Sequence, residues 1–177
     1  MKKKLLTDRL QLIPVGNRDG DTILTMLRND KIKKYLCDNR DIEKDAVESI
    51  IDGSESLFEE KGIGLWLIKD LAGRSVIGLC GFLKSDVLEI LFVTHPDFQN
   101  NGFATESALK VIAYFNQLKL KDEIFAKIDL PNAESHAVAG KIGLKEIGME
   151  KNKVIGGDMT LYKLETLQEL DSQHPIA

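Results

Sequence analysis

Cysteine is scarce in this chain of 177 residues, which contains only Cys37 and Cys80. The two lie far apart in the sequence, and neither belongs to a Cys/His cluster with the spacing of zinc ligands. A disulfide framework and a metal site are therefore not expected. Free thiols in a reducing, cytoplasmic compartment are the prediction.

Long apolar runs are also missing, since none approaches the roughly 18–20 residues that span a bilayer. The opening residues MKKKLLTDRL are basic but lack the apolar core and cleavage site of a signal peptide. Nor is positive charge in excess: 24 Lys and Arg against 28 Asp and Glu leave a net charge of -4. This balance argues against a protein that tracks nucleic-acid phosphates. We predict neither a membrane nor a nucleic-acid partner.

Residues 1–165 are predicted to form one α/β (α+β) domain, and residues 166–177 a frayed helical or disordered tail. The apolar spacing predicts helices over residues 19–36 (as one helix or two short ones), 42–60, from near 102, and 134–143. Alternation and turn signals predict seven strands, over residues 9–15, 64–70, 75–83, 87–94, 123–130, 144–150 and 158–165. The early strands read as an antiparallel meander.

The most informative segment is QNNGFATES, residues 99–107, which joins a predicted strand to a predicted helix. A helix start has about four backbone N–H groups without intrahelical partners, and it carries partial positive charge. An anion such as a phosphate can bind there, and Gly102 would let the backbone approach it closely. Neither GxxxxGK[ST] nor GxGxxG is present, which disfavours a nucleotide triphosphatase. The alternative is an Asn-Asn-Gly turn with an ordinary helix cap.

Four segments together resemble the Gcn5-related N-acetyltransferases (the GNAT superfamily), in the branch of the RimJ/RimL ribosomal-protein acetyltransferases. In chain order they are TDRLQLIP (residues 7–14), GLWLIKDLAGRSVIGLCGF (64–82), LEILFVTHPDFQNNGFATES (88–107) and NAESHAVAGKIGLKEIG (132–148). The resemblance covers about residues 7–164. It implies a GNAT-like domain, with a mixed sheet of about seven strands splayed between the fourth and fifth and flanked by helices.

The resemblance also implies a site for acetyl-coenzyme A. In that family the loop amides hold the pyrophosphate and the preceding strand pairs with the pantetheine arm. The residues at the matching positions are Leu91, Phe92, Val93, Gln99, Asn100, Asn101, Gly102, Phe103, Ala104, Thr105 and Asn132. Unpaired strand amides offer a physical basis for receiving such an arm.

Acetyl transfer to an amine needs a neutral amine, a polarised thioester carbonyl and a protonated leaving thiolate. Glu89, at the start of the strand before the loop, is the candidate base; the alternative is a solvent-facing strand residue. A backbone N–H of Leu91 or its neighbour is the candidate for polarising the carbonyl. Many family members carry a tyrosine that protonates the thiolate, but here Ala139 stands at that position. Ser135 is the candidate in its place, with helix capping alongside Asn132 as the alternative.

Trp66 and Tyr162 are candidates for the acceptor pocket, although Trp66 also fits a core position. The predicted function is transfer of acetyl from acetyl-coenzyme A to a primary amine, on a protein N-terminus or a small molecule, by direct attack. The alternative is a non-catalytic acyl-coenzyme A binding or regulatory module. A monomer or homodimer is expected.

Overall fold

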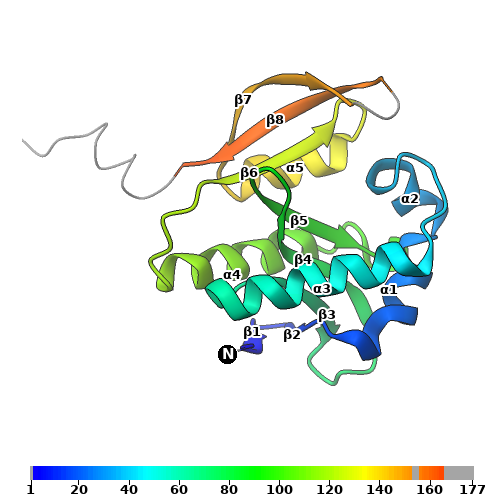
Figure 1. The fold of residues 1–177 in the computed structure, drawn as a ribbon, viewed down its shortest axis with the longest axis vertical. Helices are drawn as coiled ribbons and strands as arrows, with labels where there is room; N and C mark the ends of the chain where they lie inside the picture. The colour runs from blue at the N-terminus through cyan, green and yellow to red at the C-terminus, as the bar shows by residue number, and fades with distance from the viewer. Residues whose placement is uncertain (1, 153–155, 166–177) are drawn as a thin grey trace, which may run out of the picture.

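The computed structural model describes residues 2–152 and 156–165, and at its centre lies one mixed sheet. Within these residues the strands are β1 (Leu5–Leu6), β2 (Leu10–Pro14), β3 (Leu65–Asp70), β4 (Val76–Lys84), β5 (Leu88–Thr94), β6 (Ile124–Asp129), β7 (Leu144–Lys151) and β8 (Asp158–Leu164). They are ordered β1-β2-β3-β4-β5-β6-β8-β7 across the sheet (Figure 1). The predicted tail, residues 166–177, lies outside the described residues.

The described sheet has eight strands where the sequence predicted about seven. The additional strand is β1, whose two residues pair with β2 as Leu5 with Leu12 and Leu6 with Gln11. A pair of residues is too short to show a period-two pattern, so only the tertiary pairing reveals it. The mixed α/β fold itself is confirmed.

The helical segments are α1 (Gly20–Leu27), α2 (Asp30–Leu36), α3 (Lys44–Lys61), α4 (Phe103–Gln117) and α5 (Ala133–Lys141), with 3-10 turns η1 (Asn17–Asp19) and η2 (Pro96–Phe98). The first predicted helix is indeed divided in two. Asn29 causes the break, because its extended backbone and its side chain, which accepts the Lys31 N–H at 3.1 Å, cap the start of α2. None of the described helices has the length and apolar character needed to cross a bilayer.

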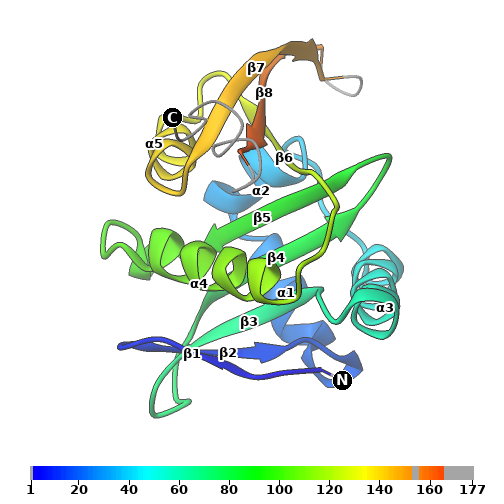
Figure 2. The ribbon, with the colours of Figure 1, turned by 90° about the vertical axis from the view of Figure 1, so that its left-hand side faces the viewer.

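The helices cover both faces of the sheet, with α4 and α5 on one face and α1 and α2 on the other (Figure 2). Strand alternation divides the core in the same way. For example, Trp66 and Ile68 belong to the cluster that includes α4, whereas Leu65 and Leu67 belong to the cluster that includes α1 and α2. A side chain that lines an opening in the sheet can therefore be assigned to one face from its place in the strand.

Candidate active site

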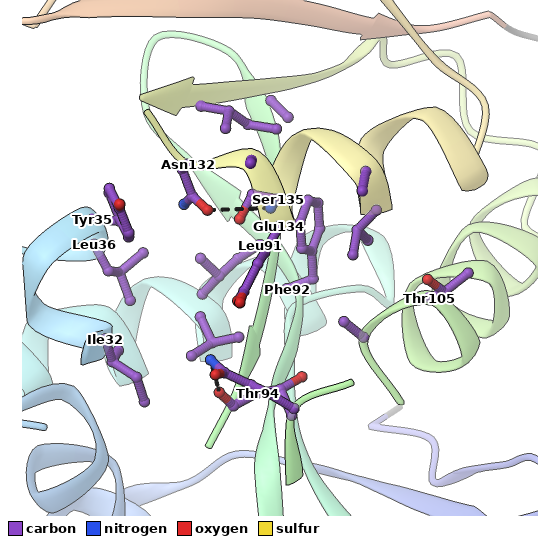
Figure 3. Close-up of a pocket in the computed structure, with 18 of the residues that line it drawn as sticks. Ile32, Tyr35, Leu36, Leu91, Phe92, Thr94, Thr105, Asn132, Glu134 and Ser135 are labelled. Carbon is purple, nitrogen blue, oxygen red and sulfur yellow. Dashed lines mark hydrogen bonds between the residues drawn. The ribbon is translucent and has the colours of Figure 1, made fainter. Parts of the chain in front are cut away.

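The sheet opens between β5 and β6. Parallel pairing joins only Leu88 to Ile124 and Glu89 to Phe125, although β5 continues to Thr94 and β6 to Asp129. A cavity of about 920 Å³ occupies this opening and is lined by both strands, by α2 and by the starts of α4 and α5 (Figure 3). This opening is the splay that was predicted between the fourth and fifth strands of the sequence-based sheet.

Most of the predicted site residues meet in this cavity. Its lining includes the predicted coenzyme residues Leu91, Phe92, Val93, Gln99, Asn100, Gly102, Phe103, Ala104, Thr105 and Asn132. Ser135 also lines it. Asn101 is not among the lining residues, because its side-chain amide turns into the loop and donates to the Phe98 and Gln99 carbonyls at 3.1 and 2.9 Å.

The loop before α4 is held in a sharply turned conformation. Asn100 and Gly102 both have positive φ angles, of 61° and 78°, and the Gln99 amide donates to the Thr94 carbonyl at 3.4 Å. No side chain caps the start of α4, where the Glu106 N–H bonds to the Gly102 carbonyl at 3.0 Å. The preceding N–H groups, of residues 103–105, therefore have no intrahelical acceptor and face the cavity end of the helix. Such a helix start can bind an anion.

The pairing of β4 with β5 determines which backbone groups of β5 face the opening. The His95 N–H donates to the Ile77 carbonyl at 2.8 Å, so these two residues form a hydrogen-bonded pair. Antiparallel pairs alternate in type, and the register aligns Val93 with Leu79 and Leu91 with Gly81. Leu91 and Val93 thus direct their backbone groups to β4, whereas Phe92 directs its N–H and C=O toward the opening.

Thr94 adds one side-chain group to this wall. It lines the cavity and is only 9% exposed, and its Oγ1 is the buried side-chain polar atom without a hydrogen-bond partner among the described residues. A buried hydroxyl without a partner costs free energy unless a ligand satisfies it. Together, the helix start, the Phe92 backbone and the Thr94 hydroxyl suit a ligand that combines a phosphate with an amide-bearing arm.

The opposite wall is the start of α5. Asn132 caps this helix, because its Oδ1 accepts the Ser135 N–H at 3.2 Å. The Ser135 hydroxyl takes no part in that cap and has no hydrogen-bond partner among the described residues. Ala139 is fully buried one turn further along α5. The structure thus separates capping, which Asn132 performs, from a free hydroxyl at Ser135 (Figure 3).

Three other predicted site residues lie outside the cavity lining. Trp66 is fully buried between Phe58 and Tyr114, and its indole N–H donates to the Lys3 carbonyl at 2.8 Å. Glu89 accepts a hydrogen bond from the Ser85 hydroxyl at 2.6 Å. Trp66 is therefore a core residue in this fold, and Glu89 lies at the closed end of the splay, where β5 still pairs with β6.

Tyr162 on β8 is the third of these residues. Its hydroxyl lies 2.8 Å from His136 Nδ1, and His136 Nε2 lies 3.2 Å from the Asp129 carbonyl. Burial raises the pKa of the Tyr162 phenol, and the Glu146 carboxylate raises it further. These contacts tie β8 to α5 and to the end of β6, and place Tyr162 behind the cavity wall.

The α2 helix contributes a wall of the cavity, although none of its residues was singled out in the sequence. Its cavity-lining residues are Lys31, Ile32, Lys34, Tyr35 and Leu36. Of these, Ile32, Tyr35 and Leu36 lie across the opening from Asn132 and Ser135 (Figure 3). A seven-residue helix without a motif carries no sequence signal for this role, because only the packing of α2 beside the splay brings it to the site.

Asp129, the last residue of β6, was also missed. Ile124, Ala126 and Ile128 face the α4 side of the sheet, so alternation directs Asp129 to the α2 side, where it lines the cavity. Burial raises the pKa of its carboxyl and the nearby Asp38 carboxylate raises it further, while a hydrogen bond from Asn152 opposes the rise. A half-buried carboxyl with a raised pKa in a cleft is a candidate for proton transfer.

Within residues 2–152 and 156–165, no group of three or more His, Cys, Asp or Glu side chains is arranged to hold a metal ion. The cavity lining instead combines apolar side chains with hydroxyls, lysines and carboxylates.

Comparison with known proteins gives consistent matches. A family model described as an acetyltransferase (GNAT) domain matches residues 9–145. The chain is 30% identical over 151 residues to the uncharacterised N-acetyltransferase YoaA of Bacillus subtilis, a match that covers 82% of this chain and 84% of that protein.

Solved structures share the fold. An acetyltransferase from Agrobacterium tumefaciens superposes with a TM-score of 0.79 at 18% identity, covering 94% of this chain and 96% of the other. RimL, a ribosomal alpha-N-protein acetyltransferase in complex with coenzyme A, superposes with a TM-score of 0.76 at 14% identity, covering 91% of this chain and 97% of the other. The family model spans more than half of the chain and the fold agrees with it, so this protein belongs to the GNAT acetyltransferases.

Proposed function

We propose that the protein transfers the acetyl group of acetyl-coenzyme A to a primary amine, on a protein N-terminus or on a small molecule. The observation that carries the proposal is the splay between β5 and β6, with an uncapped helix start at one end and a free hydroxyl, Ser135, on the facing wall. We also place the chain in the RimJ/RimL-like branch. The four matching sequence segments support this, and the RimL structure supports the fold alone.

In this proposal the N–H groups at the start of α4 and in the 99–105 loop hold the coenzyme pyrophosphate. A pantetheine amide N–H donates to the outward-facing carbonyl of Phe92 on β5, so that the arm lies along the strand like an added strand. The Thr94 hydroxyl gains the partner that it lacks among the described residues. A RimL structure with the same fold is in complex with coenzyme A, which supports the use of this cosubstrate.

The reaction is a direct displacement. The amine nitrogen forms a bond to the thioester carbonyl carbon, and the carbon–sulfur bond breaks to release a thiolate. Negative charge that develops on the carbonyl oxygen is stabilised by the Phe92 N–H, which points into the opening. The Ser135 hydroxyl then relays a proton to the thiolate and regains one from water, a role that Ala139 cannot fill because it has no polar side chain.

The amine must lose a proton, because a lysine amine has a pKa of about 10.4 and an N-terminal amine of about 8. Asp129 lies on the α2 side of the cavity, which is the side open to an acceptor, and the pKa of its carboxyl is raised. We assign Asp129 the role of attracting the ammonium group and accepting its proton, directly or through water. Glu89 remains the competing candidate, although it lies at the closed end of the splay, where β5 still pairs with β6.

The test is a hydrolysis-corrected assay of free thiol release from acetyl-coenzyme A, with a panel of N-terminal peptides, polyamines and amino sugars. Amine-dependent thiol release with a matching acetylated product is the expected result. Coenzyme binding without turnover across the whole panel would instead support an acyl-coenzyme A binding module.

A further inference from the structure

Arg9, at the turn between β1 and β2, reaches across the fold to the start of α4. Its guanidinium lies 4.6 Å from the centre of the Phe103 ring. A Cβ atom built on Gly102 would lie 3.6 Å from Arg9 Nη2, which places the guanidinium directly beside the coenzyme loop. Arg9 is not among the residues that line the cavity, so it supports the loop from behind.

The partner of Arg9 is Glu106, in the first turn of α4. Arg9 Nε and Nη2 lie 2.7 and 2.5 Å from Glu106 Oε2, and the Arg9 N–H donates to Oε1 at 3.3 Å. The Thr7 hydroxyl donates to the same Oε1 at 2.5 Å. Burial acts to raise the pKa of the Glu106 carboxyl, but the hydrogen bonds from Thr7 and Arg9 outweigh it and the pKa is lowered. Glu106 is therefore a carboxylate, held by the β1–β2 turn.

A carboxylate in the first turn of a helix is favourable for the helix itself. It is unfavourable for a second anion that binds at the same helix end, because like charges a few ångströms apart repel strongly outside bulk water. The Arg9 charge cancels that repulsion, and the ring contact with Phe103 fixes the residue that follows Gly102. Charge balance and loop shape thus come from one side chain.

We infer that Arg9 is a positioning residue for the coenzyme: it neutralises Glu106 and packs on Phe103, so that the start of α4 presents its amides to a pyrophosphate without a competing negative charge. The inference rests on the proposed function, in which that helix start binds acetyl-coenzyme A.

The experiment measures Kd for coenzyme A by calorimetry and steady-state kinetics with acetyl-coenzyme A, in the variants Arg9→Gln, Glu106→Gln and the double variant. Arg9→Gln is expected to weaken coenzyme A binding by about tenfold, because it leaves an unpaired carboxylate beside the phosphates. Glu106→Gln is expected to stay within about twofold of wild type or to bind more tightly, since the remaining charge attracts phosphate. The double variant should bind more tightly than Arg9→Gln alone.

Separate effects on KM and kcat distinguish this role from simple support of the fold. KM for acetyl-coenzyme A should rise in Arg9→Gln while kcat changes less than about twofold, and affinity for pantetheine, which lacks phosphates, should not change. Arg28→Gln is the matched control: Arg28 pairs with Glu43 at 3.3 Å and is 45% exposed against 50% for Arg9, but its guanidinium bonds to Ile42 and Glu43 and not to the start of α4. If Arg9→Gln does not fold, Arg9→Lys replaces it, with a smaller rise in KM expected.

Unchanged coenzyme A affinity in Arg9→Gln would overturn the inference. So would an equal loss for pantetheine, or a loss in Glu106→Gln as large as that in Arg9→Gln, since each would indicate a purely structural contact. If the wild-type chain itself does not bind coenzyme A, the proposed function fails instead, and the two failures are thereby distinguished.

Discussion

The two walls of the cleft are built on different principles. The β5 wall is embedded in the sheet, because all seven of its residues pair with β4, and it offers mainly backbone groups at Phe92 and in the loop that follows. The β6 wall offers side chains, namely Asp129 at the end of β6, and Asn132 and Ser135 at the start of α5. Binding of a constant coenzyme can use backbone groups, whereas proton transfer requires particular side chains.

This difference predicts how each wall responds to mutation. Truncating side chains on the β5 wall should matter little, and only added bulk or charge should block the coenzyme. Truncations on the β6 wall should remove chemistry and leave coenzyme affinity nearly intact. The predictions below test that contrast, from the largest expected effect to the smallest.

Gly102→Glu should weaken coenzyme A binding by roughly a hundredfold or more, because it places negative charge at the helix start that we propose binds the pyrophosphate. It also forces a non-glycine residue into a φ of 78°. Calorimetry with coenzyme A measures the loss. Gly102→Ala separates the two causes, since strain alone costs roughly 1 kcal/mol, and Gly53→Glu on the open surface of α3 controls for the added charge. If Gly102→Glu binds coenzyme A with wild-type affinity, the pyrophosphate does not bind at this loop.

Ser135→Ala should lower kcat by about a hundredfold, the lower range for loss of a general acid, with coenzyme A affinity almost unchanged. Its melting temperature should also stay close to wild type, because Asn132 and not Ser135 caps α5. Turnover assays and thermal melts measure both. Ser49→Ala on α3, which loses only a hydroxyl bonded to the Asp45 carbonyl, is the control. A change in melting alone would leave Ser135 without a catalytic role.

Asp129→Asn should lower kcat/KM for the amine by about tenfold or more and should raise stability at neutral pH. The pKa of Asp129 is higher in the folded protein than its ordinary value, since burial and Asp38 disfavour the charged form. A carboxyl of this kind loses stability as pH rises through the interval between its unfolded and folded pKa values. The stability gain of the variant should therefore be present at neutral pH and absent in acid.

Denaturant unfolding at several pH values tests whether the stability gain of Asp129→Asn appears as the pH rises. Glu89→Gln is the comparison for activity, and its effect should be smaller than that of Asp129→Asn because Glu89 does not line the cavity. A larger loss of kcat/KM for the amine in Glu89→Gln, one that grows as the pH falls, would instead identify Glu89 as the base.

Asn132→Ala should destabilise the protein by about 1 kcal/mol, the usual value for a lost helix cap. It should also weaken coenzyme A binding modestly, because Asn132 lines the cavity. Asn29→Ala is the matched control, since Asn29 caps α2 in the same way but does not line the cavity. Equal effects of the two variants on coenzyme affinity would assign Asn132 to capping alone.

Local signals left both an anion site and an ordinary turn open for residues 99–107, and the resemblance to the GNAT acetyltransferases favoured the coenzyme site. The order of strand, Asn-Asn-Gly loop and helix is a continuous segment, so its anion-binding geometry follows from backbone physics at short range. The same holds for Asn132 and Ser135, which lie three residues apart on one turn of α5. Trp66 could not be assigned in this way, because its burial depends on packing between α3 and α4.

The sequence was sufficient to predict the α/β fold class from the order of its elements, and the Asn-Asn-Gly loop and the two polar residues at the start of α5 from contacts between neighbours in the chain. The presence of α2 and Asp129 in the lining of the cleft emerges only from the folded structure. That structure alone also brings Arg9 to Glu106 across 97 residues of sequence. The physical reason is that such contacts depend on how elements pack against one another, and no local pattern records which distant surfaces will meet.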